Sequence, residues 1–313
     1  MKDPGERSSM GPRVLLAGPR SFCAGVERAI ETVERAIERF GPPVYVRRQI
    51  VHNRHVVCEL EERGAVFVHE LDQVPDGATV VFSAHGVAPA VSEIARARGM
   101  RVVDATCPLV AKVHHEVRRF TEQGYQVVLI GHHGHDETEG TLGEAEGVAL
   151  VEDSADVATL EIRDPEKVAY ITQTTLSPQD VAGVVRELSN RFPSIVGPRS
   201  TDICYATQNR QQAVADIAAD CDLILVVGSS NSSNAARLVE VASRAGCPSI
   251  LIEDESELDP VVVREAKVVG ITAAASTPPA IVERVIGALN ATSVEERVFR
   301  IEQVHFPLPQ EVR

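Results

Sequence analysis

The sequence is poor in several features that would point to particular functions. It contains no tryptophan, and only 4% of its residues are aromatic, so a surface that stacks nucleotide bases or sugar rings is not expected. No apolar run reaches the roughly 18 residues that a transmembrane helix needs. Residues 1–13 are polar and lack the apolar segment of a secretory signal. We therefore expect neither membrane insertion nor secretion.

Positive charge is also scarce. The chain has 31 lysine and arginine residues against 45 aspartate and glutamate residues, which gives a formal net charge of −14. Such a charge repels a phosphate backbone, and no basic run is long enough to form a binding stripe, so we expect no nucleic-acid partner. A small anion stays compatible with this charge, because histidines and helix N-termini can make a single pocket positive.

The six cysteines include no C-x-x-C pair. Because the chain also lacks a secretory signal, we interpret them as reduced thiols or metal ligands of a protein in a reducing cytoplasm rather than as disulfides. The missing close pairs argue against a structural zinc site, which usually contains them.

Short β-branched strands alternate with helical patterns along the whole chain. Its 313 residues, 44% of them hydrophobic, are enough for two or three domains. The alternation predicts the α/β class with parallel sheets. The clearest predicted pairs are strands 14–17, 101–105 and 223–227, followed by helices 26–37, 108–123 and 234–245.

Three cysteines share one position in this pattern. Cys23, Cys107 and Cys204 each lie just before a predicted helix, separated from one another by roughly the length of one small α/β unit. We therefore predict three units, each contributing one cysteine to a shared centre. The predicted ranges are 13–105, 106–203 and 204–290, with a C-terminal tail at 291–313. The other cysteines, Cys58, Cys221 and Cys247, are interpreted as structural.

The position before a helix favours metal binding, because a helix N-terminus lowers the pKa of a thiol and thiolate is the form that ligates metal. Thiolate ligands select zinc or an iron–sulfur cluster, and a cluster held at three corners leaves one iron open. A Cys-His hydrolase or transferase that uses Cys107 is an alternative, although it needs only one such cysteine. A non-enzymatic iron–sulfur sensor is a second alternative.

Polar side chains follow the predicted strands 44–50, 79–82, 126–130, 168–171, 223–227 and 267–271. Ligands of open α/β sheets bind at the carboxyl ends of the strands, so these residues are candidates for one site. We interpret the histidines as an anion pocket, the serines and asparagine as helix caps that can bind phosphate, and the glutamate as a proton donor. The candidates are His52, His85, His135, Glu137, Thr174, Ser232, Ser233, Asn234 and Ser276.

Seven segments resemble the LytB family of 4-hydroxy-3-methylbut-2-enyl diphosphate reductases, in the family's order and over about residues 13–285. They are 22–26 (FCAGV), 51–54 (VHNR), 83–87 (SAHGV), 104–110 (DATCPLV), 134–137 (GHDE), 172–177 (TQTTLS) and 202–207 (DICYAT).

The resemblance implies a trefoil of three units around a central [4Fe-4S] cluster held by Cys23, Cys107 and Cys204. It implies reductive removal of the hydroxyl group of an allylic diphosphate, which gives isopentenyl and dimethylallyl diphosphate as the last step of the methylerythritol phosphate pathway. It places Glu137 and Thr174 near the substrate hydroxyl. Ferredoxin or flavodoxin is the implied electron donor. The implied diphosphate contacts are His52, His85, His135, Ser232, Ser233, Asn234 and Ser276.

Two positions depart from the family pattern. Ser21 stands where glycine usually precedes the Phe-Cys pair, and Ala274 stands where glycine is common before Ser276. We expect Ser21 to restrict the loop if its backbone needs a positive φ, and Ala274 to crowd the ligand slightly. Neither change removes a chemical group, so activity is still expected.

Overall fold

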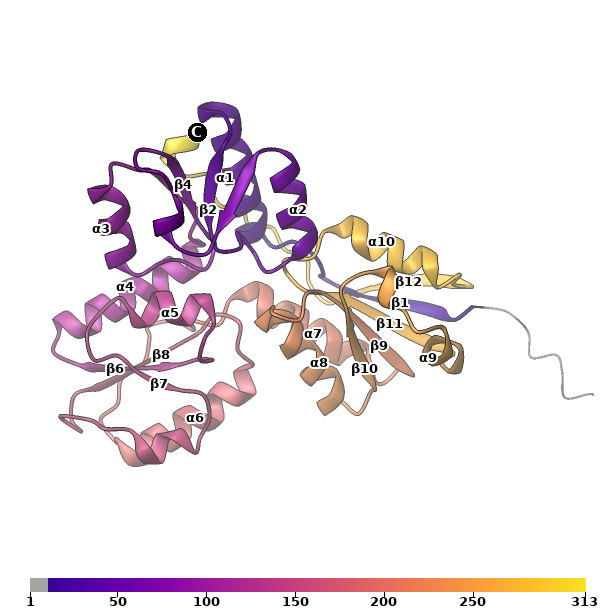
Figure 1. Ribbon diagram of the computed structural model, residues 1–313. Coiled ribbons are helices and arrows are strands. Elements are labelled where there is room, and N and C mark those ends of the chain that lie inside the picture. The colour runs from indigo at the N-terminus through magenta and orange to yellow at the C-terminus, as the bar shows by residue number, and fades with distance from the viewer. Residues whose placement is uncertain (1–10) are drawn as a thin grey trace, which may run out of the picture. The chain divides into compact units, whose positions relative to one another are not determined.

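The computed structural model describes residues 11–313 and contains three separate parallel sheets (Figure 1). The five-stranded sheet has the order β10 (Ser249–Ile252), β9 (Leu223–Val227), β11 (Val268–Ala273), β1 (Arg13–Gly18) and β12 (Ser293–Val298). The four-stranded sheet has the order β3 (Ala65–Val68), β2 (Val44–Arg47), β4 (Thr79–Phe82) and β5 (Arg101–Asp104). The three-stranded sheet has the order β7 (Ala149–Val151), β6 (Gln126–Ile130) and β8 (Val168–Thr172).

All strand pairs between these elements are parallel, which confirms the predicted α/β class and the three small units. The helices are α1 (Ala24–Phe40), α2 (Arg54–Glu62), α3 (Pro89–Ala97), α4 (Pro108–Glu122), α5 (Asp136–Leu142), α6 (Pro178–Arg191), α7 (Tyr205–Ala218), α8 (Ser233–Arg244), α9 (Pro260–Glu265) and α10 (Pro279–Ala288).

Helices cover both faces of the sheets, as expected for parallel strands that are apolar on both sides. On the three-stranded sheet, α4 packs on one face through Val113, Val117 and Phe120, and α6 packs on the other through Val184 and Leu188 (Figure 1). The five-stranded sheet lies between α10 on one face and α7 with α8 on the other.

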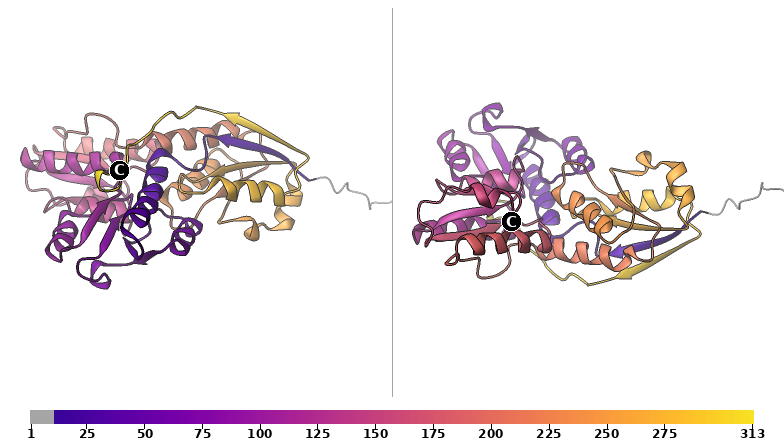
Figure 2. Two further views of the ribbon diagram at one scale, coloured as in Figure 1. Left: turned by 90° about the horizontal axis from the view of Figure 1, so that it is seen from above. Right: turned by 90° about the horizontal axis from the view of Figure 1, so that it is seen from below.

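The chain divides into two compact units. One comprises the described part of Met1–Phe22 together with Asn209–Gln303 and holds the five-stranded sheet; the other comprises Cys23–Gln208 and Val304–Arg313 and holds the other two sheets. In the second unit the C-terminal segment returns to α1, where Arg39 donates a hydrogen bond to the carbonyl of Arg313 (Figure 2).

Sheet membership does not follow the predicted ranges. The strand β1 belongs by sequence to the range 13–105, yet it pairs with β11 and β12. The strand β12 falls in the range 291–313, which was expected to be a tail. The ranges 13–105, 106–203 and 204–290 as separate domains stay a prediction.

Two local features depart from the strand pattern. The strand expected over 44–50 ends at Arg47, because Arg48 adopts a left-handed backbone conformation with φ 57° and its N–H bonds to the carbonyl of Val68. Ser21 also has a positive φ, of 61°. Its carbonyl oxygen accepts hydrogen bonds from Nε and Nη2 of the buried Arg210, at 3.2 and 2.7 Å, which hold the loop in this conformation.

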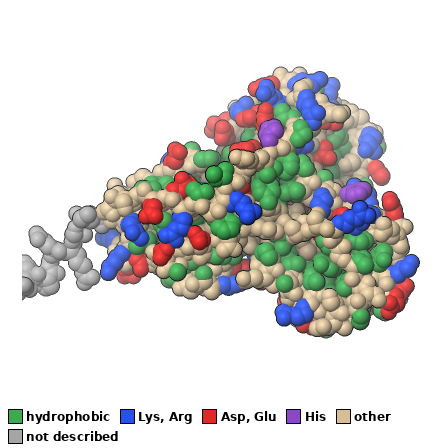
Figure 3. Space-filling model, turned by 180° about the vertical axis from the view of Figure 1, so that it is seen from behind, with side chains coloured by type: hydrophobic (Ala, Val, Ile, Leu, Met, Phe, Trp, Pro, Cys, Tyr) green, Lys and Arg blue, Asp and Glu red, His purple; other side chains and the backbone are tan. Residues whose placement is uncertain are grey.

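Charges of both signs are mixed on the surface drawn in Figure 3, where basic and acidic side chains are interspersed. Between residues 11 and 313, no helix combines the length and the apolar character needed to cross a membrane.

Replacing Ser21 with glycine should stabilise the protein. The left-handed conformation costs a residue with a Cβ atom about 1–2 kcal/mol, and glycine avoids this cost. Glycine in turn loses about 0.5–1 kcal/mol of stability, because it has more conformational entropy in the unfolded chain. The free energy of unfolding, measured in urea, should therefore rise by up to about 1 kcal/mol. Ser200→Gly, at an exposed loop position outside the set of positive-φ residues, serves as the control. An equal or lower stability of Ser21→Gly would contradict the strain at Ser21.

Candidate functional site

The three cysteines predicted to act together all lie in the unit that holds the two smaller sheets. Cys23 and Cys107 are the N-cap residues of α1 and α4, and Cys204 directly precedes α7. Backbone hydrogen bonds fix two of them: the N–H of Cys107 donates to Ala84 at 2.9 Å, and that of Cys204 donates to Thr174 at 3.0 Å. The loops that carry His85 and Thr174 therefore also hold two of the thiols.

A glycine lies where the thiols meet. A Cβ atom added to Gly25 in the first turn of α1 would lie 2.8 Å from Sγ of Cys107 and 3.8 Å from Sγ of Cys23. Only glycine leaves room for both sulfur atoms there. The Cys204 thiol interacts electrostatically with the other two thiols, so all three belong to one cluster of residues.

For Cys107 and Cys204 the pKa does not fall, as expected for a thiol at a helix N-terminus, but rises. The pKa of Cys107 is raised to about 12 and that of Cys204 to about 11, in both cases chiefly by burial. The N–H groups at the helix starts do lower these pKa values, but desolvation of the charged form outweighs them. Thiols of this kind become thiolates when a metal replaces their protons.

The other cysteines lie elsewhere, as interpreted from the sequence. Cys58 is exposed on α2, and Cys221 and Cys247 precede the strands β9 and β10. The Cys247 thiol donates a hydrogen bond to the carbonyl of Cys221 at 3.4 Å. All six cysteines are free thiols.

Three histidines form a second cluster in the same unit. His52 and His85 follow β2 and β4 of the four-stranded sheet, and His135 follows β6 of the three-stranded sheet. The rings of His52 and His85 are stacked, with centroids 4.1 Å apart, and His135 lies 5.1 and 5.7 Å from them. The structure therefore brings together the three histidines that the sequence placed at strand ends.

Burial favours the uncharged form of these three imidazoles. It lowers the pKa of His52, it lowers that of His85 well below the usual value, and it is the main cause that brings the pKa of His135 to about 4. The Nδ1 atom of His135 accepts a hydrogen bond from the N–H of Glu137 at 3.2 Å, which leaves the proton on Nε2. An anion that accepts hydrogen bonds from these rings would favour their protonated forms.

Glu137 is buried and paired with Thr174. Its carboxylate accepts hydrogen bonds from the Thr174 N–H at 2.6 Å and from the Thr174 hydroxyl at 2.9 Å. Only 2% of Glu137 is exposed, so it is not a solvated loop acid. Burial raises its pKa, although the two hydrogen bonds from Thr174 oppose this. A carboxyl group of raised pKa beside a hydroxyl suits proton donation.

The serine and asparagine candidates lie in the other unit, at the carboxyl ends of β9 and β11. Ser232 caps α8 by accepting a hydrogen bond from the N–H of Ala235, and Oδ1 of Asn234 accepts one from the N–H of Ala275 at 2.9 Å. The Nδ2 atom of Asn234 is buried and has no hydrogen-bond partner within residues 11–313. Such a donor points to a missing acceptor. Ser233 and Ser276 lie at the same two strand ends.

The methyl group of Ala274 packs inside the protein, and the expected crowding of the ligand stays a prediction. Ala274 is fully buried in the apolar cluster that includes Ala17 and Ala235. A Cβ atom on Gly228 would approach the methyl group of Ala274 to 2.9 Å, so Gly228 provides the space that this methyl group occupies.

A buried contact between His114 and Glu144, near the loop of His85, was not among the predicted site residues. Nδ1 of His114 lies 2.7 Å from Oε1 of Glu144, and both side chains are almost fully buried. A Cβ atom added to Gly86, next to His85, would lie 2.7 Å from Cε1 of His114, and one added to Gly140, one turn after Glu137, would lie 3.5 Å from it. His114 lines a cavity of about 310 Å³. His114 follows Cys107 by seven residues, which is two helical turns, so the two residues lie on the same face of α4. This spacing could have identified His114 as a candidate from the sequence.

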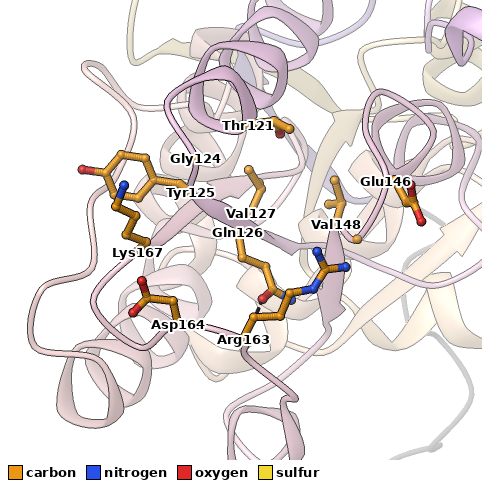
Figure 4. Close-up of a pocket in the computed structure, with 11 residues that line it drawn as sticks. Thr121, Gly124, Tyr125, Gln126, Val127, Glu146, Val148, Arg163, Asp164 and Lys167 are labelled. Carbon is orange, nitrogen blue, oxygen red and sulfur yellow. Dashed lines mark hydrogen bonds between the residues drawn. The ribbon is translucent and has the colours of Figure 1, made fainter.

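A second cavity, of about 230 Å³, lies at the amino ends of β6 and β8 (Figure 4). In Figure 4 its two basic residues point apart, Lys167 toward Tyr125 and Arg163 toward Val148. Because ligands of parallel sheets bind at the carboxyl ends, and because these cations do not converge, this cavity is not the candidate site.

The fold and the site together define a class of protein: an α/β protein in which half-buried cysteines lie beside a histidine cluster and a paired glutamate. Comparison with known proteins narrows this class. A family model described as LytB protein matches residues 14–290. The chain therefore belongs to the LytB family, as its motifs indicated.

Similar proteins bear one functional name. A 4-hydroxy-3-methylbut-2-enyl diphosphate reductase from Azoarcus sp. (strain BH72) is 55% identical over 280 residues, which cover 88% of this chain and 90% of that protein. The protein of the same name from Xanthomonas euvesicatoria pv. vesicatoria is 55% identical over 285 residues, with coverage of 88% and 89%. The structure of the E-1-hydroxy-2-methyl-but-2-enyl-4-diphosphate reductase from Plasmodium falciparum matches with a TM-score of 0.93, 39% identity and 97% coverage of both chains.

Binding of an anion to the histidine cluster should be coupled to proton uptake. Burial lowers the pKa of His52 and so favours its neutral form, whereas a bound anion would raise that pKa, so the complex should hold more protons than its separate components. Calorimetry with inorganic pyrophosphate in two buffers of different ionisation enthalpy should show that wild type takes up more protons than His52→Gln, by up to about one.

The control is His115→Gln, at an exposed position on α4. It should leave the proton uptake unchanged. Equal uptake by wild type and His52→Gln would mean that this histidine stays neutral in the complex.

Proposed function

We propose that this chain is a 4-hydroxy-3-methylbut-2-enyl diphosphate reductase of the methylerythritol phosphate pathway. The reaction breaks the bond between the allylic carbon and its hydroxyl oxygen, which leaves as water after taking a proton. Two electrons and a second proton complete isopentenyl or dimethylallyl diphosphate. The observation that carries the proposal is the backbone connection of two half-buried cysteines to the loops of His85 and Thr174, in a chain of the LytB family.

The thiols fit a [4Fe-4S] cluster as the cofactor. Cys23, Cys107 and Cys204 would hold it at three corners, and the missing side chain of Gly25 leaves space between two of the sulfur atoms. Such a cluster, when bound, supplies the electrons and a Lewis-acidic iron for the leaving oxygen. The protein contributes three soft ligands and a buried environment that keeps water away.

The histidines fit the diphosphate. His52, His85 and His135 converge from two sheets, and each can donate an N–H to a phosphate oxygen. We assign Ser232, Ser233, Asn234 and Ser276 to phosphate oxygens as well, supported by the buried Nδ2 donor of Asn234. Hydroxyl groups and N–H groups at a helix start are common phosphate ligands.

Glu137 is the proposed proton donor to the leaving oxygen. Its raised pKa favours the carboxylic acid, and the Thr174 hydroxyl at 2.9 Å can carry the proton or hold the substrate hydroxyl. The Cys204 N–H bond to Thr174 places this pair next to the thiols.

The alternatives fit these observations less well. A Cys-His hydrolase needs a thiolate nucleophile, whereas burial raises the pKa of Cys107 to about 12. An iron–sulfur sensor needs no diphosphate pocket, whereas three histidine rings suited to bind an anion lie with their centroids 4.1 to 5.7 Å apart. We propose ferredoxin or flavodoxin as the electron donor and a reducing cytoplasm as the compartment, in keeping with six free thiols.

The ligand assignment predicts a division among the cysteines. Cys23→Ser, Cys107→Ser and Cys204→Ser should each lose most bound iron and all reductase activity, because a hydroxyl group is a poor ligand for this cluster. Cys58→Ser and Cys247→Ser should keep both. Iron and sulfide assays on anaerobically purified protein measure this, and full cluster content in Cys107→Ser would defeat the assignment.

Gly25→Ala extends the same test without removing a ligand. The added methyl group would lie 2.8 Å from Sγ of Cys107, so iron content should fall although all three thiols remain. Gly287→Ala is the matched control, because this glycine also lies in a helix but has open space around it.

Glu137→Gln tests the proton donor. Glutamine keeps the size and much of the hydrogen bonding of glutamate but has no carboxylic proton. General acid catalysis contributes about 10²- to 10⁴-fold, so turnover should fall by that factor while iron content and substrate affinity stay near wild type. Wild-type turnover would move the proton source to another group, and loss of the cluster would show that Glu137 is structural.

A further inference from the structure

Arg48 joins the two sheets that carry the histidines. It follows β2, and only 15% of its side chain is exposed. Its Nη1 atom lies 2.5 Å from Oδ1 of Asp136 and 2.6 Å from Oε2 of Glu139, both on α5. Its Nη2 atom lies 3.0 Å from Oε1 of Glu70 on the side of the four-stranded sheet. One guanidinium group therefore holds acids from both sheets.

The acids that Arg48 holds on α5 are next to the site. Asp136 lies between His135 and Glu137 in the sequence, and Arg48 itself precedes His52 by four residues. The ion pair with Asp136 thus connects the segment of His52 to the segment that carries His135 and Glu137. None of the proposed chemistry passes through Arg48, so its role is one of positioning.

The negative charge of Asp136 makes its ion pair with Arg48 important for anion binding at the histidines. Oδ2 of Asp136 lies 4.0 Å from Nδ1 of His85, and ligand atoms of His52, His85 and Asp136 lie within 4.8 Å of one another. A free carboxylate at this position would repel a diphosphate. Arg48 donates a hydrogen bond to Oδ1 of Asp136 and compensates its negative charge. The positive charge of Arg48 therefore lies near the three histidines.

We propose that Arg48 is a positioning residue for the anionic end of the substrate. It fixes the start of α5 against the loop that follows β2, and it compensates the carboxylate of Asp136 beside the histidines. This rests on the proposed function, because it takes the histidines to be the diphosphate site.

The neighbouring Arg47 offers a matched control. Its side chain is 10% exposed, and it forms hydrogen bonds of 2.7 to 2.9 Å with the same partner, Glu70. All of its side-chain hydrogen bonds found within residues 11–313 go to Glu70 and none to α5. Arg47→Met therefore removes a buried arginine and an ion pair with Glu70, but leaves the connection to Asp136 intact.

The test compares Arg48→Met with Arg47→Met in the anaerobic holoenzyme. Arg48→Met should weaken the binding of inorganic pyrophosphate and raise KM by about tenfold to 100-fold, the range of a lost charged hydrogen bond, while kcat changes less. The visible spectrum of the iron–sulfur chromophore should stay as in wild type. Arg47→Met should bind pyrophosphate as wild type does.

A second substitution separates charge from general structure. Adding Asp136→Asn to Arg48→Met removes the uncompensated carboxylate, so the double variant should recover much of the lost pyrophosphate affinity. Recovery is not expected if Arg48 only supports the fold.

The outcomes distinguish this proposal from the one on which it rests. Wild-type pyrophosphate affinity in Arg48→Met, or an equal loss in Arg47→Met, overturns the role of Arg48 and leaves the reductase proposal intact. A wild-type holoenzyme that binds pyrophosphate but does not reduce the diphosphate substrate overturns the proposed function instead.

Discussion

Two backbone hydrogen bonds are the constraint on which the site depends. The N–H of Cys107 donates to Ala84, and the N–H of Cys204 donates to Thr174. Each bond joins the residue before a helix to the polar loop at the end of a neighbouring strand. Backbone bonds therefore fix Cys107 against the His85 loop and Cys204 against Thr174, and they leave both thiols available for chemistry. A change in either loop would move a thiol together with its polar neighbour.

Burial favours the uncharged forms of the thiols, the glutamate and the histidines of the site. It raises the pKa values of Cys107, Cys204 and Glu137 and lowers those of the three histidines, so each group favours its neutral form. A metal cluster that takes thiolates and a diphosphate that favours imidazolium would each supply the charge that stabilises the ionised ligand. The exception is Arg48, whose hydrogen bonds with Asp136, Glu70 and Glu139 outweigh its burial and raise its pKa.

Local patterns in the sequence predicted eight of the twelve strands described within residues 11–313, because the strand period is a property of neighbouring residues. The strand-end rule also brought His52, His85 and His135 together correctly. It had no means of finding the ion pair of Arg48 with Asp136, which joins residues far apart in sequence. The sequence also did not indicate which sheet contains β1, because an apolar strand that is buried on both faces can pair in any parallel sheet. The pKa direction of Cys107 and Cys204 was wrong because helix position was weighed without burial.

The measurement that tests the account most directly combines composition with turnover. Protein purified without oxygen should be coloured, contain about four iron and four sulfide per chain, and consume 4-hydroxy-3-methylbut-2-enyl diphosphate only when a reductant is supplied. A colourless, iron-free protein that still converts this substrate would contradict the account.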